Sequence, residues 1–136
     1  LLHSDNCYFI PHIQVSGQVC FTNLPSNTAF RGFGGPQAIA MIENIMEAIA
    51  QSLGKDALDI RRINLYSDSP RNTTHYGQLF RENKLAAIFE QLERSCDYRA
   101  RRGEIELFNR RSQLAVRGLS MTGIKFGISF TKATRW

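Results

Sequence analysis

Cysteine is scarce in this sequence, and its spacing lacks the patterns of metal or redox sites. Cys7, Cys20 and Cys96 are the only three in 136 residues, and none forms a CxxC pair. This excludes zinc ribbons and thioredoxin-like chemistry. An odd, sparse set of cysteines is typical of free thiols in a reducing compartment, so we expect a cytoplasmic protein. No basic stretch followed by an apolar core, the mark of a secretory signal, begins the chain.

Long apolar runs and strong charge imbalance are also missing. No stretch approaches the roughly 20 apolar residues of a membrane span, so we expect no membrane partner. Hydrophobic residues make up 43% and charged residues 21%, which excludes a disordered chain. The net charge of +5 favours anionic partners without identifying one. The three histidines show no metal-ligand spacing, and we assign no metal ligand in this chain.

Hydrophobic spacing predicts an α+β protein with strands on either side of about four helices. Apolar residues recur at helical spacing in four segments, and the helices are expected over residues 36–53, 56–64, 83–95 and 98–112. Residues 8–23 carry short strand-like alternations. Residues 124–131 alternate plainly between apolar and polar side chains, which predicts a half-buried strand.

A glycine-rich loop, residues 31–36, is the most informative stretch. Glycines at 32, 34 and 35 allow positive φ and close approach of the backbone to a ligand. Pro36 suits the start of a helix, whose N-terminus favours anions. Arg31 adds a forked donor for an oxyanion. An anion site and a tight packing loop are equally good interpretations, and both the Rossmann and the P-loop patterns fail here.

Two other features leave alternatives open. Phe33 lies between two glycines, so its ring either enters the core, the commoner fate, or faces a ligand. Arginines at 99, 101, 102, 110 and 111 could contact nucleic acid, but Glu104 and Glu106 lie between them. An ion-paired helix face is therefore favoured over a nucleic-acid-binding module, and we expect no nucleic-acid partner.

Three stretches together resemble the molybdenum-binding part of xanthine dehydrogenases. Residues 27–37 (NTAFRGFGGPQ) resemble the family signature, and residues 5–8 (DNCY) and 125–131 (KFGISFT) agree in order and spacing. The related aldehyde oxidases have a similar loop, but Phe30, Gly32 and Gly35 are more similar to the xanthine dehydrogenase version. The resemblance covers nearly the whole chain and is highly specific.

The resemblance implies a molybdenum–molybdopterin cofactor and a purine substrate. It places Arg31, Gly32 and Gly34 at the cofactor, puts Phe33 and Phe130 on the two faces of the purine, and brings Thr131 into contact with it. It also implies that the complete enzyme oxidises xanthine or hypoxanthine to urate with water-derived oxygen. Electrons then pass through 2Fe-2S clusters and FAD to NAD.

The same resemblance implies that much of the site lies elsewhere. The general base of the family, a glutamate, falls outside this chain, so we assign no catalytic residue within it. We expect residues 1–136 to be a partial molybdopterin-binding domain, inactive by itself, from a longer and oligomeric enzyme with Fe-S and FAD portions. The alternatives are an aldehyde oxidase-type hydroxylase and a non-catalytic binding domain that keeps the glycine-rich loop.

Overall fold

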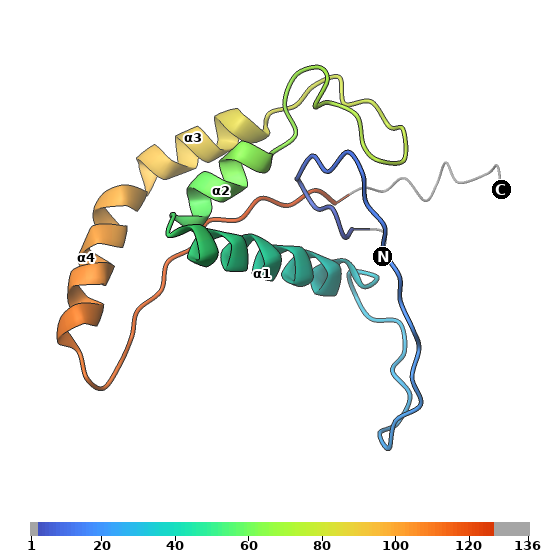
Figure 1. Ribbon diagram of the computed structural model, residues 1–136, viewed down its shortest axis with the longest axis horizontal. Coiled ribbons are helices and arrows are strands. Elements are labelled where there is room, and N and C mark those ends of the chain that lie inside the picture. The colour runs from blue at the N-terminus through green and yellow to red at the C-terminus, as the bar shows by residue number, and fades with distance from the viewer. Residues whose placement is uncertain (1–2, 127–136) are drawn as a thin grey trace.

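The computed structural model describes residues 3–126, and within them the chain forms four helices and no β-sheet (Figure 1). The helices are α1 (Gly35–Leu53), α2 (Ala57–Asn64), α3 (Leu85–Ser95) and α4 (Tyr98–Arg111). These bounds agree closely with the four helices predicted from hydrophobic spacing. The α+β class, however, is wrong: the described part of the chain is helical.

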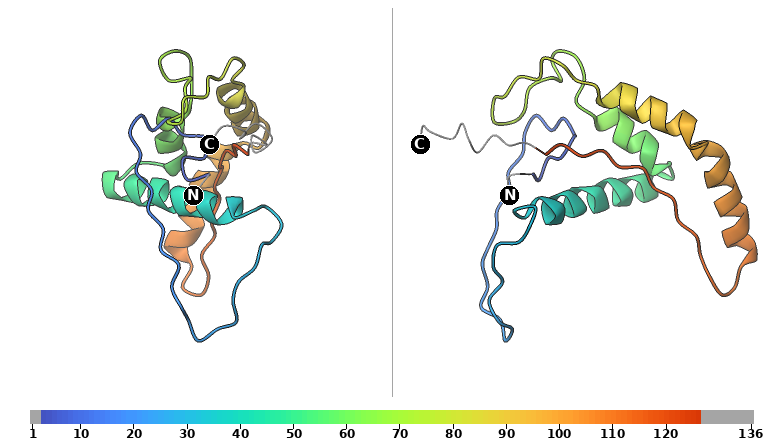
Figure 2. Two further views of the ribbon diagram at one scale, coloured as in Figure 1. Left: turned by 90° about the vertical axis from the view of Figure 1, so that its right-hand side faces the viewer. Right: turned by 180° about the vertical axis from the view of Figure 1, so that it is seen from behind.

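The flanking strands are absent because extended chain alone does not make a sheet. Residues 9–31 run out and back as an arm without a strand ladder (Figures 1 and 2), and Val19 and Phe21 are fully exposed. Isolated bridges join Tyr8 to Leu65 and Thr73 to Leu79. Alternation predicts which way side chains point, whereas a strand also needs a neighbour that supplies backbone hydrogen bonds. The predicted strand 124–131 fails for the same reason over residues 124–126, and its remainder lies outside the described residues.

Local signals explain where the helices begin and end. Asp56 caps α2, because its carboxylate accepts a hydrogen bond from the Leu58 N–H at 2.9 Å. Gly54 ends α1 in the left-handed region, at φ +60°. Asp97 stands at the N-cap position of α4, but its side chain makes no capping hydrogen bond.

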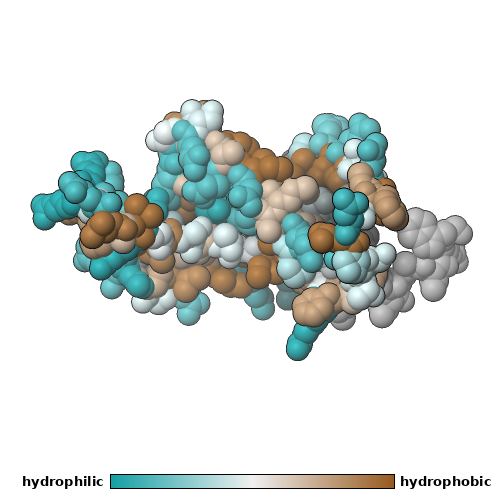
Figure 3. Space-filling view, turned by 90° about the horizontal axis from the view of Figure 1, so that it is seen from below, coloured by the Kyte–Doolittle hydropathy of each residue, from teal (hydrophilic) through white to brown (hydrophobic). Residues whose placement is uncertain are grey.

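Helix α1 is apolar on two faces. Ile42, Met46 and Ala50 are buried against the rest of the molecule. The adjacent face is also apolar, and Figure 3 shows hydrophobic surface over α1. Its exposed side chains are Met41, Ile45, Ile49 and Leu53.

Two segments without regular structure complete the core. Residues 3–8, near the N-terminus, are buried, and residues 119–126 cross the molecule between α1 and α3 (Figure 1). Gly123 lies against Cys7 and Phe89 of α3. Burial of Cys7 raises its pKa to about 12, which keeps this thiol protonated and unreactive. The core therefore depends on contacts between the two ends of the described chain.

Candidate functional site

The glycine-rich loop forms two successive tight turns at the start of α1. The Phe33 N–H donates to the Phe30 carbonyl at 3.0 Å, and the Gly35 N–H donates to the Gly32 carbonyl at 2.8 Å. Residues 32, 33 and 34 have φ values of +95°, +50° and +75°. Three consecutive residues in this region make a conformation that glycine adopts readily and other residues adopt at a cost.

Gly32 is required for space as well as conformation. A Cβ atom at this position would lie 2.8 Å from Cδ of Pro36, which no real contact allows. At Gly34 a Cβ would meet nothing within 4 Å, so only its φ value favours glycine there. The loop therefore packs closely against the first turn of α1.

Phe33 is held in a strained conformation with its side chain exposed. Left-handed backbone costs a non-glycine residue about 1–2 kcal/mol, and the side chain remains 63% exposed. The interpretation in which this ring fills the core is wrong. Strained residues held in place by their surroundings are frequent at ligand sites.

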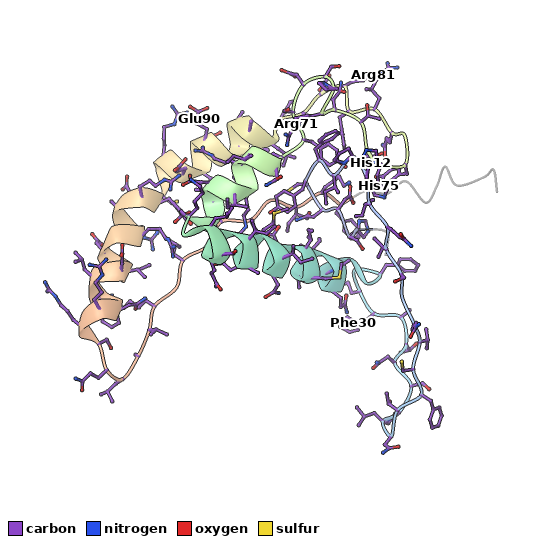
Figure 4. The ribbon with its side chains drawn as sticks, in the orientation of Figure 1. His12, Phe30, Arg71, His75, Arg81 and Glu90 are labelled. Carbon is purple, nitrogen blue, oxygen red and sulfur yellow. The ribbon has the colours of Figure 1, made fainter. Side chains whose placement is uncertain are left out.

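Arg31 also presents its side chain to solvent, beside the exposed Phe30 at the base of the arm (Figure 4). It forms no ion pair with any other residue in the range 3–126. The N–H groups of Gly32 and Gly34 likewise have no acceptor in that range. A guanidinium and two backbone N–H groups in one loop form a donor set suited to an anionic ligand.

The C-terminal end of the described chain reaches this loop. A Cβ at Gly35 would lie 2.7 Å from Cε2 of Phe126, and the Phe126 ring stacks on His3 with centroids 4.6 Å apart. Gly35 therefore serves as a packing glycine, as the interpretation of residues 31–36 as a tight packing loop supposed. The segment 125–131 therefore starts beside α1, where Phe126 packs on Gly35. Phe130 and Thr131 lie outside the described residues.

The comparisons with known proteins agree on one family. Residues 1–65 match the family model "Molybdopterin cofactor-binding domain". Over 131 residues, 96% of this chain, it is 44% identical to the xanthine dehydrogenase of Oryza sativa and 45% identical to the xanthine dehydrogenase/oxidase of Felis catus. The chain is similar to xanthine dehydrogenases over nearly its whole length. It is also 45% identical, over 134 residues, to the nicotinate hydroxylase hnxS of Emericella nidulans.

The chain spans about a tenth of the length of these xanthine dehydrogenase relatives: 9% of the rice protein and 10% of the cat and fungal ones. These matches confirm the resemblance seen in the sequence, and they support molybdenum–molybdopterin as the cofactor. The loop is compatible with that cofactor, because Arg31 and the backbone N–H groups of Gly32 and Gly34 are donors without partners in residues 3–126. The individual roles of these residues remain predictions.

A buried polar network beside α1 escaped prediction from the sequence. Glu43 accepts hydrogen bonds from Asn6 at 2.9 Å, from the Tyr8 hydroxyl at 2.6 Å and from Arg61 Nε at 2.7 Å. Burial opposes the charge of Arg61, but the hydrogen bond and charge of Glu43 outweigh it and raise the pKa of Arg61. The one available signal was residues 5–8, which the resemblance used without assigning them a role.

A second polar cluster surrounds Asp5, which is fully buried. It accepts hydrogen bonds from Lys125 and, at 2.8 Å, from the Tyr66 hydroxyl. Burial raises the pKa of Tyr66, and the hydrogen bond to Asp5 adds to that effect. His12 and His75 lie close together nearby (Figure 4) and line one surface hollow. Residues 3–126 contain no group of three or more metal-ligating side chains.

The arginine-rich helix α4 is an ion-paired surface, as the glutamates among its arginines suggested. Arg110 pairs with Glu106 on the same helix. Arg99 and Arg102 reach acidic side chains outside α4, namely Asp56, Asp59 and Glu93. Separately, none of the helices in the described range is long and apolar enough to span a membrane.

Proposed function

We propose that this chain forms part of the cofactor and substrate site of a molybdenum hydroxylase that oxidises xanthine or hypoxanthine to urate with water-derived oxygen. One observation carries the proposal. The loop that resembles the family signature holds Phe33 exposed at a strained positive φ, next to the exposed Arg31. A side chain kept out of the core at such a cost is well placed to contact a flat ligand.

Within this function, Arg31, Gly32 and Gly34 bind the cofactor through the guanidinium and the backbone N–H groups. The molybdenum–molybdopterin group supplies the redox chemistry when bound. Phe33 and Phe130 hold the two faces of the purine, and Thr131 offers it a hydroxyl. The general base comes from outside this chain, so the chain alone should be inactive. Detectable xanthine oxidation by the isolated chain would contradict this assignment.

We extend the proposal to the complete protein. Its Fe-S and FAD portions receive the electrons and pass them to NAD, and the enzyme is an oligomer. A cytoplasmic location is supported by the cysteines at positions 7, 20 and 96, all of which are free thiols.

Nicotinate hydroxylation is a second candidate function, because the fungal relative of that name is as similar to this chain as the xanthine dehydrogenases are. The deciding experiment compares kcat/KM of the full-length enzyme for xanthine, nicotinate and an aromatic aldehyde. A preference for xanthine supports the first proposal, and a preference for nicotinate or for the aldehyde replaces it with the corresponding alternative. Failure to oxidise any of the three would favour a non-catalytic binding protein.

Phe33→Ala in the full-length enzyme is expected to lower kcat/KM for xanthine about two- to tenfold, since aromatic stacking contributes about 0.5–1.5 kcal/mol. Molybdenum content should stay near that of the wild type. Phe33→Gly separates the ring from the backbone, because glycine removes the positive-φ strain yet should lose as much kcat/KM. Phe30→Ala, three residues earlier and 82% exposed, is the matched control. Unchanged kcat/KM in both Phe33 variants would refute the stacking role.

Arg31→Ala is expected to lower cofactor occupancy, measured as molybdenum per protein. A hydrogen bond to a charged group contributes about 1.5–3 kcal/mol, so affinity should fall roughly tenfold or more. Arg31→Lys keeps the positive charge but not the forked guanidinium, so it should lose less molybdenum than Arg31→Ala. Arg81→Ala serves as the control, since Arg81 is exposed and lies far from Phe30 at the base of the arm (Figure 4). Equal molybdenum content in all variants would exclude Arg31 from the cofactor site.

A further inference from the structure

Asn6 joins two parts of the chain that are far apart in sequence. Its side chain is fully buried, and its backbone adopts φ +45°. The amide makes three hydrogen bonds: Nδ2 donates to the Gly123 carbonyl at 2.8 Å and to Glu43 Oε1 at 2.9 Å, while Oδ1 accepts from the Lys125 N–H at 3.0 Å. Both hydrogens of the amide nitrogen are thus used.

The bonds to Gly123 and Lys125 reproduce the contact that a neighbouring strand would make. In extended chain, the carbonyl of one residue and the N–H of the residue two positions later point to the same side. The primary amide of Asn6 offers one donor and one acceptor to this pair. One side chain therefore fixes the register of residues 123–125, where the structure provides no strand to do so.

The third bond ties the same amide to α1. Glu43 is held in turn by Tyr8 and Arg61, so its carboxylate is fixed in position. A second contact joins the two segments closer to the glycine-rich loop, where Phe126 packs on Gly35. Residues 123–126 are thus fastened to the helix whose N-terminus carries Arg31 and Phe33.

We propose that Asn6 is a positioning residue that sets the register of the segment entering residues 127–131 relative to the glycine-rich loop. Because Phe130 and Thr131 follow this segment in the chain, the register would also govern the substrate contacts proposed for them, an inference that rests on the proposed function. Asparagine suits the position, because it is one of the few residues other than glycine that adopts the left-handed conformation readily. A residue serving only the core would have no effect on substrate affinity in correctly folded, loaded enzyme.

The test uses the full-length enzyme with two substitutions. Asn6→Gly removes the amide without backbone strain, and Asn6→Asp keeps its size and acceptor but removes both N–H donors. Asn109→Ala is the matched control. The exposed Asn109 amide also pairs with the backbone, donating to the Arg117 carbonyl at 2.9 Å and accepting from the Arg117 N–H at 2.8 Å, in the connection after α4.

For the Asn6 variants we expect a roughly ten- to hundredfold loss of kcat/KM for xanthine, since small misplacements of binding groups have effects of this size. The loss should appear mainly in KM, with kcat per molybdenum changed much less. Amide hydrogen exchange should quicken in residues 123–131. The Asn109 control should keep its KM and its exchange in that segment.

Three outcomes would overturn the proposal. They are an unchanged KM of the molybdenum-loaded Asn6 variants, an equal rise of KM in the Asn109 control, and loss of folding or of molybdenum in both Asn6 variants. Failure of the proposed function is distinguishable, because wild-type enzyme would then not oxidise xanthine. In that case KM is measured with the substrate that the enzyme does oxidise. If it oxidises none, hydrogen exchange in residues 123–131 decides, and unchanged exchange overturns the positioning role.

Discussion

Glu43→Ala is expected to destabilise the packing of α1 on α2 by about 3–5 kcal/mol, the usual cost of removing one partner from a buried ion pair. Arg61 is its ion-pair partner, with a side chain only 3% exposed. After the substitution, the Glu47 contact at 3.2 Å would be the remaining ion pair that the structure gives to Arg61. Asn6 and Tyr8 would lose an acceptor as well. The large effect follows from leaving the buried Arg61 charge with only the more exposed Glu47 as its partner, and from leaving the Tyr8 hydroxyl and one Asn6 N–H without an acceptor.

Hydrogen exchange in the full-length protein provides the measurement, because it reports the opening of individual segments. Protection of the amides of α1 and α2 should fall by about two to four powers of ten, since 1.4 kcal/mol corresponds to a factor of ten. Glu90→Ala is the matched control on α3. Glu90 is 62% exposed, points outward (Figure 4) and lies 3.8 Å from Arg94, so its loss should cost less than about 1 kcal/mol.

A double variant separates the loss of the attraction between Glu43 and Arg61 from the cost of leaving Arg61 buried without Glu43. Adding Arg61→Met to Glu43→Ala removes the buried guanidinium and should restore part of the protection, because apolar replacements of buried ion pairs are often tolerated. The recovery should remain incomplete, since Asn6 and Tyr8 still lack their acceptor. Protection equal to wild type in Glu43→Ala would mean that water or another group replaces the carboxylate.

The helices could be predicted from the sequence because their signals are local. The apolar spacing in residues 36–53 acts within a few residues, and the structure confirms a helix there. Gly54, which ends α1, and Asp56, which caps α2, are local features of the same kind. The conformation of the glycine-rich loop was foreseeable for the same reason. Gly32 and Gly34 do adopt the positive φ values that their sequence pattern favours.

The sheet and the polar network depend on contacts between distant residues. The alternation that begins at Ile124 indicates extended chain, but it cannot show that a side chain, Asn6, takes the place of a strand 117 residues away. Likewise, one face of α1 includes Glu43, a residue that looks like surface until Arg61 and Tyr8 are brought to it. Pairings of this kind have no signature in a single sequence.

Gly123→Ala is expected to destabilise the core by about 1–3 kcal/mol, through overpacking. A Cβ atom at this position would lie 2.8 Å from Cε2 of Phe89 and 2.9 Å from Sγ of Cys7. Both neighbours are buried, at 3% and 0% exposure, so neither can move aside freely. The effect comes from space alone, since no positive φ is found at Gly123. The carbonyl that Asn6 binds would also be pushed out of register.

The matching control lies five residues earlier in the same segment. A Cβ at Gly118 would meet nothing within 4 Å, so Gly118→Ala should be neutral or slightly stabilising, because alanine lowers the entropy of the unfolded chain. Hydrogen exchange of α3 and of residues 119–126 in the full-length protein measures both variants. Gly123→Ala should quicken exchange around Phe89, and Gly118→Ala should leave it unchanged. Equal exchange in the two variants would show that Cys7 and Phe89 can move apart at little cost. Asn6 alone would then fix the register of residues 119–126.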